Sequence, residues 1–331
     1  MVYIYKKTVG GKIYYYLRAS ERQKGKVISK DIAYLGNNIT TVKKELNKLS
    51  KYKKNIEKSY RKINLFLESN HFLEETKKLK LKQNSLLENL LYEIEACKLH
   101  YNKEFKKIDA LTQEQIMSNF IVEYAFNTTA LEGNTINLKD AQYLLEEGLT
   151  PKGKTLREIN DLQNTKNVFN NLDFKKDISN KLIKKIHSDL LENIDSRTEY
   201  RNKDIRITHT RFKATPFYRI DKEIDLLLKW HKQNIKKMHP FVNAIIFHHK
   251  FEKIHPFFDG NGRTGRMLMN FILLKRNYPP IIIRNKYRSS YLDALNKADK
   301  SQLNQTEKKH YKELIQFSAT ELNETYWNNF L

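Results

Sequence analysis

Hydrophobic and polar positions alternate along the first 36 residues in the manner of β-strands. Two runs rich in valine, isoleucine and tyrosine, VYIYKKTV and KIYYYLRAS, are separated by Gly10 and Gly11. Two β-prone runs around a Gly-Gly pair are typical of a hairpin. A second turn at residues 22–25 precedes a third run, KVISKDIAYLG. The pattern therefore predicts a small three-stranded β-meander.

From residue 41 onward, apolar residues recur every three or four positions, which is the period of a helix buried on one side. The first such stretch covers residues 42–67 and the second covers 79–101, with a break near Ser69 and Asn70. The spacing predicts two long amphipathic helices that pack as an antiparallel pair. Cys97 falls on the apolar stripe of the second helix, so we expect a buried, unreactive thiol.

A helical domain is predicted from about residue 111. Thr112 and Gln115 have the spacing of a capping box, and Gly133 suits the end of the same helix. Residues 204–218 alternate in polarity and contain a proline, which predicts a short hairpin or flap. Further helices are predicted over residues 138–147, 155–171, 178–193, 221–237, 241–252, 263–276 and 287–299. The fold class is therefore mainly α, with parts at 1–38, 39–107 and 108–331.

The composition adds a positive charge. The 331 residues include 61 Lys and Arg against 38 Asp and Glu, a formal net charge of +23. Residues 1–60 carry fifteen of the basic residues and four of the acidic ones, or +11. Cationic surfaces bind phosphate chains, so nucleic acid is an alternative partner of this segment. No helix-turn-helix, zinc-finger or RNP-type motif accompanies the charge, and a general lysine bias would also give a basic surface.

Several classes of protein are disfavoured. No apolar run approaches the ~18 residues of a membrane span, and the first residues lack the apolar core of a signal peptide. The single cysteine excludes an internal disulfide and fits a reducing compartment. We therefore expect a cytoplasmic protein without a membrane segment.

Three of only ten glycines fall within residues 260–265, in the loop HPFFDGNGRTGR between two apolar helical runs. A loop that opens a helix offers unpaired backbone N–H groups, and Gly260 and Gly262 let a ligand approach them closely. Arg263 and Arg266 are three residues apart, so both guanidinium groups can reach phosphate oxygens over the first turn. The loop is suited to a polyphosphate.

The other polar residues of this loop suit the chemistry of a phosphoryl centre. Asp259 is placed to hold Mg²⁺ between two phosphates. Asn261 can hydrogen-bond a phosphate oxygen through its amide. His255 can accept a proton from an attacking hydroxyl. Together these residue types favour nucleotide chemistry over a simple helix cap.

This segment resembles the signature of the Fic family (filamentation induced by cyclic AMP), H-x-F-x-[DE]-G-N-G-R-x-x-R, at every defined position. The resemblance implies an adenylyltransferase (AMPylase) that moves AMP from ATP to a Ser, Thr or Tyr hydroxyl of a target protein. It implies His255 as the general base and Asp259 as the Mg²⁺ ligand. Asn261 and the glycine amides would bind the α- and β-phosphates, and Arg263 and Arg266 the β- and γ-phosphates.

A second resemblance lies in AFNTTALEGNT, where Thr128, Glu132 and Gly133 match the family's inhibitory pattern [ST]-x-x-x-E-[GN]. Thr128 and Glu132 are one helical turn apart, and the glycine ends the helix, which leaves the carboxylate at its exposed end. In the family this glutamate pairs with the second motif arginine, here Arg266, and displaces the γ-phosphate. The resemblance thus implies an inhibitory helix over about 112–133.

The resemblance covers roughly residues 111–300. Within it, Ile205 and Ile207 lie in the segment that matches the family's flap, which aligns a target peptide by strand addition. Tyr291 is a candidate contact beside the adenosine, and Asp299 stands where some relatives have asparagine. Residues 1–107 lie outside the catalytic fold and are expected to recognise a target or regulate the enzyme.

Alternatives within the same fold remain open. The site could instead remove AMP from a modified protein, with Glu132 positioning a water, or transfer another phosphate-containing group. Toxin-like kinase relatives carry lysine in place of the second motif glycine, and Gly262 argues against that branch. The expected partners are ATP and a target protein or the chain itself, and a homodimer is compatible with the sequence.

Overall fold

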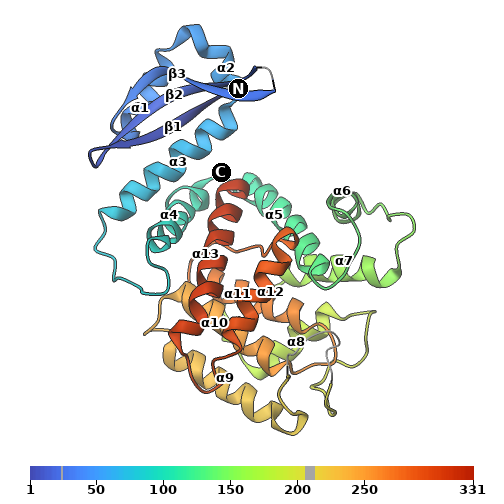
Figure 1. Ribbon diagram of the computed structural model, residues 1–331. Coiled ribbons are helices and arrows are strands. Elements are labelled where there is room, and N and C mark those ends of the chain that lie inside the picture. The colour runs from blue at the N-terminus through green and yellow to red at the C-terminus, as the bar shows by residue number, and fades with distance from the viewer. Residues whose placement is uncertain (24, 206–212) are drawn as a thin grey trace.

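The structure is a computed structural model that describes residues 1–23, 25–205 and 213–331. It is mainly helical, with one antiparallel three-stranded sheet among the described residues, so the predicted fold class is confirmed. Figure 1 shows the sheet at one end of the molecule and the helical body at the other, with a single long helix, α3, running between them.

The meander is confirmed, with strands β1 (Val2–Val9), β2 (Lys12–Gln23) and β3 (Lys26–Gly36) in that order. Gly10 and Gly11 both have positive φ, as the tight turn of a two-residue hairpin requires. One face of the sheet is apolar and packs on α1 (Ile39–Asn47) and α3 (Tyr60–Lys77).

The predicted pair of long helices differs from the structure. The first is divided into α1, α2 (Lys53–Lys58) and α3, and the second, α4 (Leu90–Lys103), begins eleven residues later than expected. The break predicted near Ser69 is wrong, because the Asn70 amide donates to the Phe66 carbonyl within a continuous α3. Helices α3 and α4 do pack together.

Two hydrophobic clusters divide the chain near the middle of α3. The smaller one runs from Val2 to Leu67 and holds the sheet. The larger one begins at Phe72 and includes α4 and most of the helices that follow it, while α6 (Leu138–Gln142) packs with parts of α5 (Ala110–Ala130) and α7 (Leu156–Asn170) in a separate small cluster. The division at residues 38 and 107 stays a prediction, and α3 contributes to both clusters.

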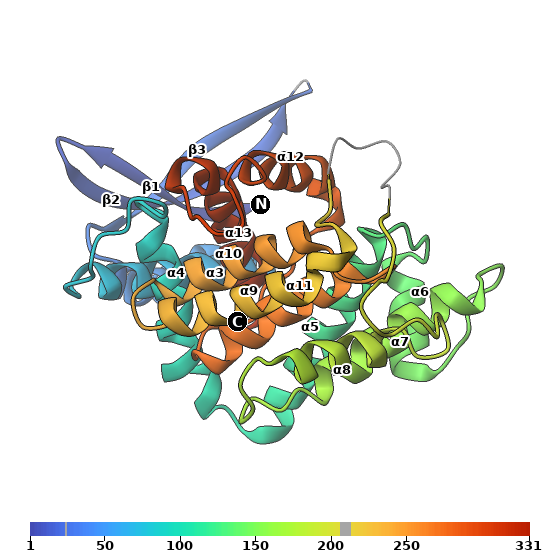
Figure 2. The same ribbon diagram turned by 90° about the horizontal axis from the view of Figure 1, so that it is seen from below.

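The larger cluster surrounds α10 (Pro240–Ile254) and α11 (Asn261–Lys275), which lie side by side at the centre of the helical body (Figure 2). Pro240 occupies the first turn of α10, where its missing N–H costs no helical hydrogen bond. The surrounding helices are α5 (Ala110–Ala130), α6 (Leu138–Gln142, followed by a π-helical turn Tyr143–Glu147), α7 (Leu156–Asn170), α8 (Asn180–Leu190), α9 (Ile220–Asn234), α12 (Arg288–Ala298) and α13 (Lys308–Asn329). Short 3-10 turns cover Ser50–Tyr52, Phe105–Lys107, Phe217–Arg219 and Asn285–Tyr287.

Helices α5 to α12 lie where the sequence predicts them, but α13 was not predicted. Its buried side includes polar residues that interrupt the apolar stripe. Glu321 accepts a hydrogen bond from the Arg284 backbone N–H at 2.7 Å, and the Thr325 hydroxyl accepts one from Ile282. The burial of these polar residues depends on partners far away in the sequence.

Two local predictions about α5 need correction. The helix begins after Asp109, whose carboxylate accepts the Thr112 N–H at 3.0 Å, so Thr112 and Gln115 do not form a capping box. The helix ends at Ala130, and a further turn leads to Gly133, which has a φ of +101°. The aspartate one turn earlier supplies the stronger cap.

The hairpin predicted over residues 204–218 falls mostly outside the described residues, and so does Ile207. Ile205 is partly buried. Cys97 is fully buried, as expected, and burial raises the pKa of its thiol. None of the described helices is long and apolar enough to cross a membrane.

Buried histidines make the stability of the fold sensitive to mild acid. Burial lowers the pKa of His100, His231 and His255 to about 4 and that of His248 to about 3. In the unfolded chain these groups take up protons below pH ~6.5, so the native state loses stability as the pH falls from there towards 4. Burial raises the pKa of Glu252 to about 8, so this group makes the native state more stable as the pH falls. It therefore offsets the effect of one of the four histidines.

We therefore expect the free energy of unfolding to fall by several kcal/mol between pH 7 and pH 5, at roughly 1.4 kcal/mol per pH unit for each net group. Urea unfolding followed by circular dichroism at pH 7, 6 and 5 measures it. A constant midpoint over this range would contradict the burial of these imidazoles in neutral form.

Candidate active site

The glycine-rich loop joins the two central helices, α10 and α11. His255 ends α10 in the left-handed region, with a φ of 53°, and Gly260 takes a φ of 73° immediately before α11. A Cβ atom on Gly260 would lie 2.7 Å from Leu191, which follows α8. The position therefore favours glycine for two reasons: its positive φ and the lack of space for a side chain. The backbone path of the loop is therefore fixed by α8 as well as by its own residues.

Asn261 folds the loop with its side chain. Its amide oxygen accepts the Phe257 N–H and its amide nitrogen donates to the Phe257 carbonyl, both at 2.9 Å. Phe257 is fully buried and stacks on the His187 ring with the centroids 3.5 Å apart. His187 also contacts the Asp259 carbonyl at 2.9 Å. The predicted contact between Asn261 and phosphate stays a prediction, while its structural role is evident.

His255 is held as a neutral ring. Its Nδ1 lies 3.3 Å from the Glu252 carbonyl, which can only accept, so Nδ1 carries the proton and Nε2 is the basic nitrogen. Burial lowers the pKa of His255 to about 4 in spite of the nearby Glu132 and Asp259 carboxylates. Arg201 fixes the backbone here by donating to the His255 carbonyl at 2.9 Å.

Arg266 is buried and paired with the end of α5. Its Nη2 donates to Glu132 at 2.7 Å and to the Thr128 carbonyl at 3.0 Å, and its Nε donates to the Thr128 hydroxyl at 2.7 Å. The ion pair between Glu132 and Arg266 that the resemblance implied is therefore present. Gly133, with its positive φ, turns the chain away directly after this glutamate.

Gly262 makes room for that ion pair. A Cβ atom at this position would lie 2.0 Å from Glu132 Oε1 and 2.9 Å from an Arg266 nitrogen. The ion pair between Glu132 and Arg266 therefore requires a residue without a side chain at position 262. This is a second reason for glycine there, besides the close approach of a ligand that the sequence suggested.

Four charged side chains alternate in sign along the contact between α7 and the loop. Arg157 pairs with Asp259, and Asp161, one turn later on α7, pairs with Arg263. Arg263 also lies 3.5 Å from Asp259. Burial alone would raise the pKa of Asp259, but Arg263, the Gly260 N–H and Arg157 together hold it below its usual value. Asp259 is therefore a carboxylate, as a metal ligand must be.

Asp259 alone offers too few oxygen atoms to coordinate Mg²⁺, so the site fits this ion only when a bound ligand supplies further oxygens. No three His, Cys, Asp or Glu side chains in the described parts of the chain could hold a metal by themselves. Mg²⁺ commonly uses one carboxylate together with water and phosphate oxygens. The partly exposed carboxylate of Asp259 beside the N-terminus of α11 matches that arrangement.

Glu252 lies beneath Arg266 and was not singled out from the sequence. It is deeply buried, and its Oε1 has no hydrogen-bond partner among the residues that the structure describes. Burial raises the pKa of Glu252 to about 8, against the opposing effect of Arg266. At neutral pH it is largely protonated, so Glu132 is the carboxylate that neutralises Arg266.

Sequence reasoning also missed Arg157, Asp161 and Arg201. The first two have an i, i+4 spacing just after the helix start at Thr155, which is a detectable signal of a shared helix face but not of its partner. Arg201 carries no signal that points to the loop, because it holds the loop through the backbone carbonyl of His255, while its ion pair is with Asp204 three residues later.

Tyr291 and the paired histidines lie behind the loop. The Tyr291 hydroxyl lies 2.6 Å from His248 Nε2, and its ring is buried. His249 contacts Tyr311 and Asp299, each at 3.0 Å. These contacts agree with a structural role for both histidines. The predicted contact of Tyr291 with adenine stays a prediction.

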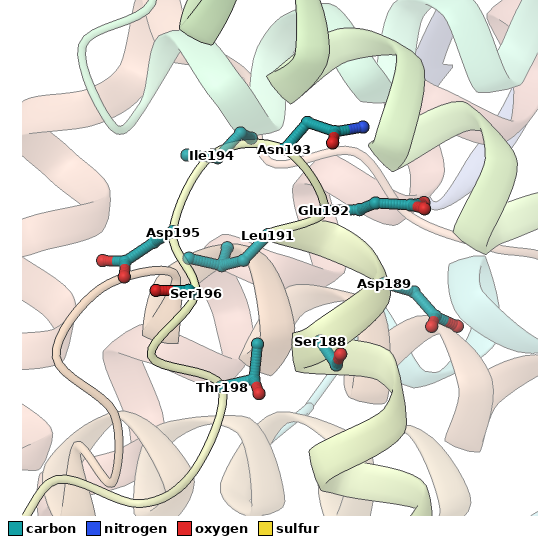
Figure 3. Close-up of a pocket in the computed structure, with 9 residues that line it drawn as sticks. All are labelled: Ser188, Asp189, Leu191, Glu192, Asn193, Ile194, Asp195, Ser196 and Thr198. Atoms are coloured by element: carbon teal, nitrogen blue, oxygen red, sulfur yellow. The ribbon is translucent and has the colours of Figure 1, made fainter.

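A hollow of about 530 Å³ opens beside the loop, between the end of α8 and residues 191–198 (Figure 3). Its lining includes Asp189, Glu192 and Asp195 but none of the motif residues 255–266. An acidic lining repels phosphate, so this hollow is not the site that the loop predicts.

Comparison with known proteins identifies the class of protein. Residues 177–273 match the model of the Fic/DOC family, and this stretch includes the whole loop, all of α10 and α11 as far as residue 273.

Curated relatives are similar over about half of the chain. Protein adenylyltransferase fic-1 from Caenorhabditis briggsae is 30% identical over 183 residues, which is 53% of this chain and 36% of the relative. Protein adenylyltransferase Fic from Drosophila ananassae is 30% identical over 188 residues, or 55% and 37%. The chain thus spans little more than a third of the length of these relatives.

Solved structures share the fold. A Fic-domain-containing signalling protein from Bacteroides thetaiotaomicron superposes with a TM-score of 0.66 at 20% identity, over 72% of this chain and 96% of that one. Fic-1 from Caenorhabditis elegans gives a TM-score of 0.56 at 21% identity, over 88% and 76%.

The steric relation between Gly262 and Glu132 is testable by a double-mutant cycle. Gly262→Ala forces Glu132 away from buried Arg266, so it should destabilise the protein by about 1–3 kcal/mol, the cost of an unpaired buried group. In a Glu132→Gly background the clash with the carboxylate is absent and only the 2.9 Å contact with the Arg266 nitrogen remains, so the alanine should cost clearly less. Urea unfolding of the four proteins measures the coupling, and additive effects would contradict it.

Proposed function

We propose that this chain is an autoinhibited protein adenylyltransferase that transfers AMP from ATP to a hydroxyl of a target protein. The observation that carries the proposal is the loop between α10 and α11. It combines a neutral imidazole, the N-terminus of α11 and two arginines, one of them already paired with Glu132. The names of the relatives support the same reaction.

In the proposed reaction, the target hydroxyl oxygen attacks the α-phosphorus of ATP. The new bond joins that oxygen to the phosphorus, the bond from the α-phosphorus to the bridging oxygen breaks, and pyrophosphate leaves. His255 Nε2 accepts the hydroxyl proton, because the carbonyl of Glu252 keeps the proton of the neutral ring on Nδ1. The amides of the first turn of α11 and the two arginines bind and orient the phosphates.

Mg²⁺ belongs to this proposal as a cofactor that Asp259 would hold. When bound, it neutralises phosphate charge and so eases the departure of pyrophosphate. The cytoplasmic location, the homodimer and the docking of a target strand along Ile205 and Ile207 are proposed on the sequence alone.

Inhibition follows from the charge at Arg266. The Glu132 carboxylate pairs with the guanidinium that would otherwise bind a phosphate, and Thr128 accepts hydrogen bonds from its Nε and Nη2. A γ-phosphate would have to displace Glu132 to reach Arg266. Removal of AMP from a modified protein is the alternative use of the same glutamate, and it would make Glu132 necessary rather than inhibitory.

Glu132→Gly should therefore raise the rate of AMP transfer, by tenfold or more if displacement of the glutamate limits binding. The measurement is transfer of label from α-³²P-ATP to lysate proteins or to the chain itself, read after gel electrophoresis.

Adding His255→Ala to Glu132→Gly is the matched control, and it should lower the rate by roughly 10²–10⁴-fold because the base is lost. No transfer by Glu132→Gly would contradict the proposed reaction. Release of AMP that requires Glu132 would favour the reverse reaction.

A second candidate function rests on the outer face of the sheet. The strand register places five tyrosines there, whereas the opposite face is buried: Tyr3, Tyr5, Tyr14, Tyr16 and Tyr34. Tyr34 is 54% exposed and lies 5.4 Å from the Tyr16 ring and 6.4 Å from the Tyr14 ring, measured between centroids. Exposed Lys7 and Lys12 border this tyrosine face.

We propose that the tyrosine face binds single-stranded nucleic acid as an accessory function. Unpaired bases stack on aromatic side chains, while lysines attract the phosphate chain, and duplex bases are already stacked on each other. The +11 charge of residues 1–60 complements this ligand.

Tyr34→Ser should weaken binding of a fluorescein-labelled 20-nucleotide oligo(dT) about fivefold or more, since stacking contributes roughly 1–3 kcal/mol per base. Fluorescence anisotropy at two salt concentrations measures it. Tyr60→Ser, at an exposed tyrosine on α3, is the control and should leave binding unchanged. Absence of binding at low salt, or equal binding of duplex DNA, would contradict the proposal.

A further inference from the structure

The carboxylate proposed to hold the metal is already occupied by protein donors. Asp259 Oδ1 accepts the Gly260 N–H at 2.6 Å and lies 3.5 Å from Arg263. Its Oδ2 pairs with Arg157 of α7. A divalent cation that binds Oδ2 would therefore compete with the guanidinium group of Arg157.

Arg157 is the partner that can be displaced. Its side chain is 56% exposed, whereas Arg263 is 2% exposed and is held by Asp161. An exposed arginine can turn into solvent without leaving a buried charge unpaired. Arg263 cannot do so, because its movement would also leave Asp161 without its partner.

The backbone that carries Arg157 is tied to the turn that presents Glu132. The Glu158 side chain accepts the Thr135 N–H at 3.1 Å and its hydroxyl at 2.6 Å, and it also accepts the Thr155 N–H at the start of α7. The Asn134 amide donates to the Glu158 carbonyl at 2.9 Å. The turn after α5 and the start of α7 are therefore joined through Glu158. This joined segment carries both Glu132, which contacts Arg266, and Arg157, which contacts Asp259.

We propose that Arg157 competes with the divalent cation for the Asp259 carboxylate and so lowers the metal affinity of the site. This inference rests on the proposed function. It adds a second inhibitory contact, between Arg157 and Asp259, which would oppose binding of the metal ion. Arg157 would affect binding of the metal ion, whereas Glu132 would affect binding of the phosphates. A substitution at one residue therefore tests one effect without removing the other.

The test measures Mn²⁺ binding to the purified full chain by electron paramagnetic resonance of free Mn²⁺, with and without a non-hydrolysable ATP analogue. All proteins carry Glu132→Gly, so that the glutamate does not influence the analogue. Arg157→Gln should tighten Mn²⁺ binding about fivefold, which corresponds to about 1 kcal/mol, the upper range for an exposed ion pair. Binding of the analogue without metal should be unchanged.

The matched control is Arg197→Gln. Arg197 is equally exposed, lies over the Phe258 ring of the same loop and pairs with Asp195, so its loss changes the net charge without touching Asp259. It should alter Mn²⁺ affinity less than twofold. Thermal unfolding of each variant confirms that the fold is intact.

Equal or weaker Mn²⁺ binding by Arg157→Gln would overturn the inference, as would an equal gain in Arg197→Gln. Weaker binding of the metal-free analogue would overturn it too, because Arg157 would then be a phosphate ligand. A gain in Mn²⁺ affinity without AMP transfer to any protein would leave the competition standing and contradict only the proposed function.

Discussion

A buried guanidinium at Arg266 is the constraint on which the site depends. A buried charge must be paired, and α5 supplies the partners through Glu132 and Thr128. The same pairing requires a glycine at position 262, where a side chain would collide with Glu132. Under the proposed function, the pairing that satisfies this buried charge also covers a guanidinium that would bind phosphate, so the pairing and ligand binding would oppose each other at Arg266.

The loop is shaped by residues that need not touch a ligand. Asn261 closes the loop onto Phe257, Phe257 stacks on His187, and Arg201 holds the carbonyl of His255. This support fixes the imidazole in a buried position where it is neutral, because burial lowers its pKa to about 4. The position of the His255 ring thus depends on α8 and on the segment after it.

The sequence allowed prediction of the meander, of most helices and of the pair between Glu132 and Arg266, because each depends on local spacing or on a long motif. It did not allow prediction of α13, because buried Glu321 and Thr325 interrupt its apolar stripe. These two side chains accept hydrogen bonds from the backbone N–H groups of Arg284 and Ile282, which lie far away in the sequence. The pair between Arg157 and Asp259 was missed for the same reason. Spacing indicates which residues share a helix face, but not which distant residue that face meets.

The two pairs that cover the site have opposite polarity, and this has a consequence for selectivity. Glu132 covers a cation, Arg266, while Arg157 covers an anion, Asp259. Free phosphate can replace only the first and a free metal ion only the second, so each alone leaves one pair to oppose it. A metal–polyphosphate complex carries both charges at a suitable separation and can replace both pairs at once. Under the proposed function, the site would therefore favour the complex over either component.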